Sequence, residues 1–232
     1  MSLPPRARWG VALALTLGAC ANCPTTGPSS PGTMVKIPND SRSAAFEAWL
    51  EAEHLFARGQ SDAAVDDLLV AARIMARQPA RGFEGAIDGE PGAPTGPLRP
   101  VTIASAEGAL AAAQAIAGDH APTLERIAAA SRVLPPAETL GPQRAHRTLG
   151  AGGRDFVTWS LAAGDIGEVA ALGDGRGDLD LWVVDDHFAT VCADVEGRDE
   201  ARCRWVAAPG THYDVVIKNV GKSATRYVLL VR

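Results

Sequence analysis

The chain has 232 residues, of which 47% are hydrophobic, 21% charged and 5% aromatic, and its 27 acidic and 22 basic residues give a net charge of -5. This length and composition agree with a globular protein of one or two small domains. The mild acidity argues against a nucleic-acid partner, because nucleic acids are bound through a basic surface.

The beginning of the chain has the three parts of an export signal. Arg6 and Arg8 supply positive charge, residues 9–17 form a short apolar run, and small residues follow. The run is too short to cross a bilayer as a permanent helix. The sequence Leu-Gly-Ala-Cys at 17–20 resembles the lipobox of bacterial lipoproteins, which implies cleavage before Cys20 and lipidation of this residue. The alternative is an ordinary secretory signal with an incidental cysteine.

The lipobox resemblance implies a lipid-anchored protein of the bacterial cell envelope. Residues 1–19 would be the signal peptide, and Cys20 would carry more than one acyl chain, which is enough for stable attachment to a membrane. Residues 20–39 are rich in Pro, Gly, Ser and Thr and are expected to form a disordered tether. We expect the protein to face the periplasm or the cell surface, with the outer membrane favoured.

Helical periodicity predicts a small helical unit over residues 40–134. Phe46, Trp49 and Phe56 share one stripe of a first helix, which Gly59 ends. A second helix follows after a short turn, so the two should form a hairpin. This pair weakly resembles a single tetratricopeptide repeat, but no second copy follows at a period of about 34 residues, and a generic hairpin is preferred.

Two further alanine-rich helices are expected before residue 134, which gives about four helices in the unit. Residues 78–100 are rich in proline and glycine, and this predicts a loop with no element of its own. Residues 135–152 begin with a Pro-Pro pair and are expected to be a linker.

Beyond residue 153 the period of the pattern changes from helical to two, which indicates strands. We predict an α+β protein in which the helical unit is followed, over 153–232, by an antiparallel jelly-roll-like β-sandwich. The seven expected strands are 155–161, 167–172, 179–184, 190–194, 203–207, 213–219 and 225–232.

The strand from residue 179 shows the alternation most clearly. Leu179, Leu181 and Val183 fall on one face, whereas Asp180 and Trp182 fall on the other. The first face should lie in the core together with alternate residues of the last two strands. Trp182 and Asp180 then mark a candidate binding surface, whereas the other tryptophans of the folded part are expected to fill the core.

Several motifs of this region are similar, in order, to those of the bacterial pre-peptidase C-terminal domain. They are Gly-Asp-Leu-Asp-Leu-Trp-Val-Val-Asp at 177–185, Cys-Arg-Trp at 203–205, the segment 213–221, and Tyr-Val-Leu at 227–229. The resemblance implies a jelly-roll-like sandwich that is appended to secreted proteins and has no chemistry of its own. It also implies that calcium or an insoluble polymer such as collagen is a conceivable ligand, because some relatives bind these.

Cysteines suggest one disulfide in an oxidising compartment. If Cys192 and Cys203 lie on neighbouring antiparallel strands, their bridge closes a loop of about eleven residues and contributes about 2 to 3 kcal/mol. A zinc site is less favoured, because no histidine cluster accompanies the cysteines.

The acidic loop before residue 179 is a candidate calcium site. Asp174, Asp178 and Asp180 offer oxygens, and Asp185 and Asp186 add more if the end of the strand lies near the loop. The spacing is not that of an EF-hand. The preferred interpretation is that these acids only solvate a turn and bind backbone amides.

No catalytic motif is present, and the five histidines are scattered singly. We therefore predict a non-enzymatic envelope lipoprotein whose helices bind an envelope protein and whose sandwich is a stabilising or binding module. The alternative is an enzyme or accessory protein that acts on envelope peptide or glycan through an interdomain site. That alternative requires a nucleophile, a base and an orienting group to meet near His146, Asp155 and the proline-rich loop.

Overall fold

The computed structural model describes residues 41–93, 104–137 and 141–232. The signal peptide, the lipidation site at Cys20 and the tether were predicted for segments that lie outside these residues. All described helices and strands belong to one unit of the chain, Ile37–Arg232. None of the described helices combines the length and the apolar character that crossing a membrane requires.

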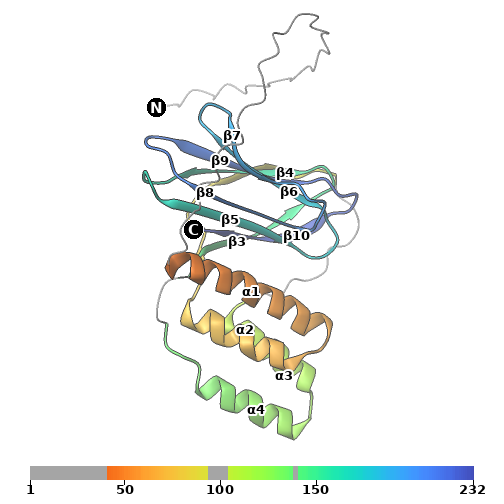
Figure 1. The fold of residues 1–232 in the computed structure, drawn as a ribbon. Helices are drawn as coiled ribbons and strands as arrows, with labels where there is room; N and C mark the ends of the chain where they lie inside the picture. The colour runs from red at the N-terminus through yellow and green to blue at the C-terminus, as the bar shows by residue number, and fades with distance from the viewer. Residues whose placement is uncertain (1–40, 94–103, 138–140) are drawn as a thin grey trace, which may run out of the picture. The chain divides into compact units, whose positions relative to one another are not determined.

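The described part of the chain contains four α-helices, as predicted, with two short strands between the second helix and the third (Figure 1). They are α1 (Ser41–Ser61), α2 (Val65–Arg77), α3 (Ala106–Ala117) and α4 (Ala121–Arg132). The side chain of Ser105 caps α3 by accepting a 2.9 Å hydrogen bond from the backbone N–H of Gly108. Gly118 ends this helix with a positive φ of 53°.

The helices pack in chain order, α1 on α2, α2 on α3 and α3 on α4. Their core is formed by large side chains of α1 and α2, such as Trp49, Leu68 and Met75, and by the alanines of α3. Gly59 permits the close approach of α1 and α2, because a Cβ at this position would lie 2.6 Å from Cγ of Leu68.

The strands form two five-stranded sheets. Sheet A has the order β1-β3-β10-β5-β8 and sheet B the order β2-β4-β9-β6-β7, and every pair of strands is antiparallel except β1 with β3. The strands of sheet A are β1 (Arg81–Gly82), β3 (Gln143–Leu149), β10 (Thr225–Val231), β5 (Ile166–Gly173) and β8 (Glu200–Val206). Those of sheet B are β2 (Ile87–Glu90), β4 (Arg154–Ser160), β9 (His212–Asn219), β6 (Leu179–Asp185) and β7 (Thr190–Asp194).

The predicted alternation places the core of the sandwich between the two sheets. Leu181 on β6, Ile217 on β9 and Leu229 on β10 are all fully buried. Trp205 packs edge-on against Trp159, with ring centroids 5.8 Å apart. The fold class, a helical unit followed by a two-sheet β-sandwich, is confirmed.

The sandwich starts earlier in the chain than residue 153. The prediction of a linker over 135–152 was wrong at β3, and the prediction of a loop without elements over 78–100 was wrong at β1 and β2. Five of the seven residues of β3 are polar or charged, so it lacks the apolar alternation of the other strands. It is a strand because β10 pairs with its whole length.

Cys192 and Cys203 form the predicted disulfide, with their Cα atoms 5.9 Å apart. They are not on paired strands, however. β7 is the edge strand of sheet B and β8 is the edge strand of sheet A. The disulfide therefore joins the two sheets at one edge of the sandwich.

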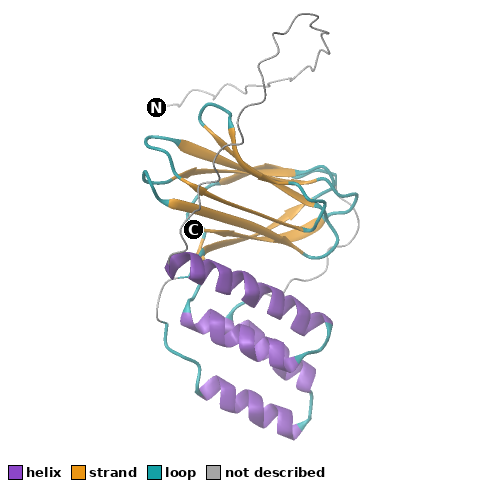
Figure 2. Cartoon of the chain, in the orientation of Figure 1, coloured by secondary structure: helices purple, strands orange, loops and turns teal. Residues whose placement is uncertain are grey.

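The helical unit is packed directly on sheet A. Ala170, Leu172 and Leu230 point outward from sheet A and belong to the same apolar cluster as Phe46 and Trp49 of α1. In the part of the chain that the structure describes, this cluster contains no residue of sheet B. The helices lie on one side of the strands in Figure 2, and the outer face of sheet B lies on the other side.

Buried charges accompany this helix-sheet contact. Glu168 on β5 binds Arg204 at 3.2 Å and also binds Arg232. The hydroxyl of Ser43 on α1 accepts hydrogen bonds from both arginines, at 3.0 and 2.7 Å. The first turn of α1 is thus fixed to β8 and to the residue that follows β10 by charge-assisted hydrogen bonds.

Candidate functional site

The outer face of sheet B carries a short apolar row that crosses three strands. The strand register places Phe156 on β4 opposite Val216 on β9, and Val216 opposite Trp182 on β6. All three side chains are half-buried. Because neighbouring strands lie about 4.8 Å apart, the two aromatic residues are separated by about 10 Å. We call Phe156, Val216 and Trp182 the apolar row.

A row of alternating charges runs along one side of the apolar row. The register aligns Glu90, Arg154, Lys218 and Asp180 across β2, β4, β9 and β6. Nε of Arg154 lies 2.9 Å from Oε2 of Glu90, and its guanidinium lies 5.9 Å from the ring centroid of Phe156. Burial and the neighbouring Asp178 raise the pKa of Asp180, and this is opposed by the positive charge of Lys218.

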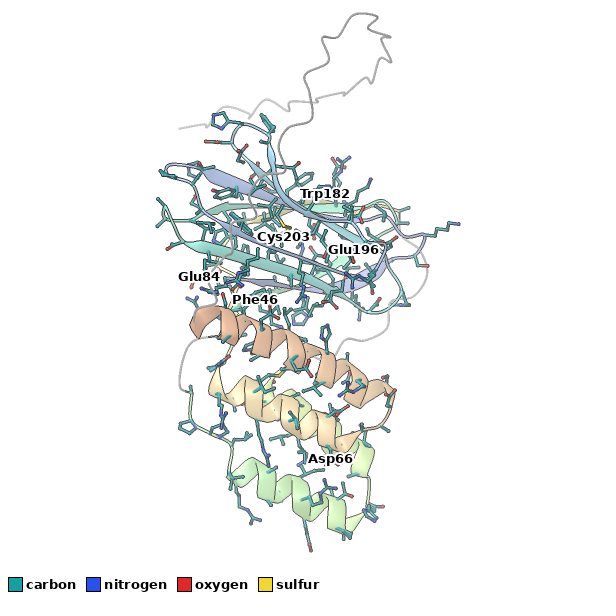
Figure 3. All side chains as sticks on the ribbon, viewed as in Figure 1. Phe46, Asp66, Glu84, Trp182, Glu196 and Cys203 are labelled. Atoms are coloured by element: carbon teal, nitrogen blue, oxygen red, sulfur yellow. A yellow bond between two sulfur atoms is a disulfide. The ribbon has the colours of Figure 1, made fainter. Side chains whose placement is uncertain are left out.

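Hydrogen-bonding groups lie on the other side. The hydroxyl of Thr158 donates to Asp214 at 2.8 Å, and the hydroxyl of Ser160 lies 2.7 Å from Nδ1 of His212. The outer face of sheet B therefore presents apolar and aromatic surface between two rows of polar groups. Figure 3 shows Trp182 on this sheet, away from Phe46 of α1.

The predicted position of Trp182 and Asp180 on one outward face is thus observed. The sequence reasoning missed Phe156, Val216 and Lys218, although Phe156 alternates with the buried Val157 within a predicted strand. Its outward direction could have been read from this alternation. Its alignment with Trp182 could not, because the register depends on β9, which lies between the two strands.

In the described part of the chain, Asp174, Asp178 and Asp180 do not form a group of closely spaced ligand atoms. Asp174 accepts hydrogen bonds from Arg176 at 2.8 Å and from Thr225 at 3.0 Å, and Asp180 lies on the outer face of sheet B. These contacts fix the carboxylate of Asp174 within the turn before β6.

Among the described residues, closely spaced ligand atoms for a metal are found in one acidic group. It consists of Asp185, Asp186 and His187 in the turn after β6. Oδ1 of Asp185 accepts hydrogen bonds from the backbone N–H groups of His187 and Ala189, at 2.9 and 2.8 Å. This carboxylate therefore shapes the turn between β6 and β7.

The residues named for an interdomain catalytic site do not meet. Asp155 is 1% exposed inside the sandwich, where it accepts two 3.0 Å hydrogen bonds from Arg147 and one of 2.6 Å from the hydroxyl of Tyr227. His146 lies on the outer face of sheet A, where burial and then Arg144 lower its pKa to about 4. No hydrogen bond joins His146 to Asp155 or to a hydroxyl group in the described part of the chain.

Two of three comparisons with known proteins find no match. No family model matches the chain, and no curated protein matches it. Among solved structures, it is similar to the pre-peptidase C-terminal domain of collagenase from Bacillus anthracis, with 14% identity over 39% of this chain and 89% of that chain, at a TM-score of 0.35. This is the kind of domain that the sequence motifs resemble.

Two other solved structures show a similar level of likeness. The Yersinia pseudotuberculosis-derived mitogen has 15% identity, covers 39% of this chain and 85% of that chain, and has a TM-score of 0.30. A carbohydrate-binding module, CBM36, in complex with calcium and xylotriose has 15% identity, 40% and 88% coverage, and a TM-score of 0.26.

Proposed function

We propose that the protein is a non-enzymatic lipoprotein of the bacterial cell envelope whose sandwich binds an extended glycan on the outer face of sheet B. The observation that supports this most is the apolar row, which places Trp182 and Phe156 on one outward face with charges along one side.

Sugar rings suit this surface. Their apolar ring faces pack on aromatic side chains, and their hydroxyl groups can pair with Asp180 and Lys218 on one side and with Asp214 on the other. The two aromatic residues are far enough apart to contact different sugars of one chain. The ligand would therefore lie across the strands rather than along them.

The other parts of the chain have supporting roles in this proposal. Acyl chains on Cys20 hold the protein at the membrane, and residues 20–39 give the folded part reach into the envelope. The helices bind an envelope protein. Because α1 is covered by sheet A, this partner would contact the free faces of α2, α3 or α4.

Co-sedimentation with insoluble glycans tests the proposal. The full chain is mixed with purified peptidoglycan sacculi, cellulose or chitin and centrifuged, and the bound fraction is measured. Trp182→Ala should weaken binding by about tenfold or more, because it removes one of two stacking surfaces. The half-buried position of Trp182 makes this change tolerable for the fold.

Phe188→Ala is the matched control. Phe188 is 86% exposed in the turn after β6, so it measures nonspecific adhesion through an aromatic side chain. It should bind as the wild type does. Equal retention of the Trp182→Ala variant and the wild type on every glycan, or no retention of either, would contradict the proposal.

A further inference from the structure

A second site lies between α1 and sheet A, and it does not depend on sheet B. Arg144 points outward from β3 beneath α1, and its side chain is only 8% exposed. Its Nη1 donates to the backbone oxygen of Ala104, and its guanidinium lies 5.6 Å from the ring centroid of Trp49. Its Nε and Nη2 atoms are buried and make no hydrogen bond.

Glu53 on α1 neutralises this arginine incompletely. Its Oε1 lies 3.2 Å from Nε of Arg144, but the two atoms are not aligned as a hydrogen bond, and Oε1 has no other hydrogen-bond partner. Burial raises the pKa of Glu53 to about 7, against the attraction of Arg144. Nη2 of Arg144 thus makes no hydrogen bond, and a buried donor of this kind is costly unless another group binds it.

A groove of about 1140 Å³ adjoins this pair. It is bounded by the C-terminal half of α1 and by β3, β10 and β5. Phe56, Leu172 and Val228 give it apolar walls, and Gln60 and Arg226 add polar groups. The volume is sufficient for a small organic molecule, and pockets for such ligands combine mainly apolar walls with a few placed polar groups.

We propose that this groove binds a small organic carboxylate that has an apolar body. The ligand carboxylate takes the place of the Glu53 carboxylate beside Arg144. There it accepts two parallel hydrogen bonds from the Nε and Nη2 atoms, the geometry in which arginine binds carboxylates best. The apolar body packs on Phe56, Leu172 and Val228. The carboxylate can belong to a free acid or to the C-terminus of a peptide.

Calorimetric titration of the full chain in detergent tests this site. The probes are 3-phenylpropionate, its uncharged amide, and a short peptide that ends in phenylalanine with either a free or an amidated C-terminus. The free carboxylates should bind with one site per chain, and both amides should bind at least about tenfold more weakly. Tighter binding of the peptide acid than of 3-phenylpropionate would identify a chain terminus as the source.

Two variants locate the site. Ala57→Trp fills the groove from an exposed position of α1 and should weaken carboxylate binding by about tenfold or more. Ala44→Trp, at an exposed position elsewhere on α1, is its control and should change binding by less than about twofold. Arg144→Lys should also weaken binding about tenfold, because lysine lacks the planar fork.

The outcomes that overturn the proposal are distinct from a failure of the glycan-binding proposal. Equal binding of acid and amide, unchanged binding by Ala57→Trp, or no binding of either free carboxylate up to about 10 mM would each overturn it. Trp182→Ala should leave carboxylate binding unchanged, because it lies on the other sheet. If Arg144→Lys does not fold, the Ala57→Trp and Ala44→Trp pair still decides the question.

Discussion

Asp155 links the two sheets through hydrogen bonds inside the sandwich. Its carboxylate comes from β4 of sheet B, and its partners Arg147 and Tyr227 come from β3 and β10 of sheet A. Burial first, and then the negative charge of Asp155, raise the pKa of Tyr227, so the phenol remains a hydrogen-bond donor. This cluster is structural, which explains why Asp155 is not available to His146.

Glu53 should make the stability of the fold depend on pH. Its pKa is raised from 4.5 to about 7, so the folded chain holds this proton more tightly than the unfolded chain does. The free energy of unfolding should therefore fall as pH rises from about 4.5 to about 7, by about 3 kcal/mol for a shift of this size. Glu53→Gln removes this titration.

Urea unfolding of the wild type and of Glu53→Gln at about pH 5 and about pH 8 measures the effect. The free energy of unfolding of the wild type, minus that of the variant, should fall by about 2 to 3 kcal/mol between the two pH values. The lowered pKa of His146 acts in the opposite direction below pH 6.5, but it is common to both proteins and cancels in the difference. A constant difference would contradict the role of Glu53.

At the scale of elements, the disulfide should stabilise the edge of the sandwich. Cys192 and Cys203 are 11 residues apart and lie on β7 and β8, which belong to different sheets. Replacing both with alanine should lower the free energy of unfolding by about 2 to 3 kcal/mol, because the unfolded chain gains freedom. Thermal unfolding followed by circular dichroism measures the loss.

Reduced wild-type protein is the control for that variant. The reductant should cause a similar loss without removing any core atoms, whereas it should leave the double alanine variant unchanged. A melting temperature of the wild type that does not respond to reductant would contradict a stabilising role for the bridge.

Elements with strong local patterns could be predicted from the sequence. β6, β9 and β10 alternate between apolar and other residues, and α1 and α2 carry apolar stripes, so all five elements were found. The predicted end of the first helix at Gly59 was wrong by two residues, because α1 continues to Ser61. β3 was not predicted, because its polar residues are accommodated by tertiary contacts. Its outward residue Arg144 is paired with Glu53 of α1, and its backbone is hydrogen-bonded to β10. Such partners belong to the tertiary structure and leave no periodic signal.

The candidate sites also combine features that local sequence predicts with features that depend on tertiary contacts. The outward direction of Trp182 and Asp180 follows from local alternation, and the disulfide follows from the count of cysteines. The apolar row depends on cross-strand register, and the pairing of Glu53 with Arg144 joins residues 91 positions apart. These contacts could not be read from the sequence.

At the scale of the whole molecule, the helices and the sandwich should unfold together. The apolar cluster of the helices includes Ala170, Leu172 and Leu230 of sheet A, and Ser43 and Glu168 add polar contacts. Far-ultraviolet dichroism, dominated by the helices, and tryptophan fluorescence should therefore change in one transition. Two separate transitions would show that the helices fold independently of sheet A.

Within the described residues, the helices cover sheet A and leave the outer face of sheet B open to a ligand, and mapping the ligand by NMR tests this most directly. Labelled protein is titrated with soluble peptidoglycan fragments or chito-oligosaccharides. The account predicts amide shifts concentrated in β4, β9 and β6, together with a shift of the Trp182 indole N–H. Shifts confined to the helices or to sheet A, or no shifts at saturating glycan, would contradict it.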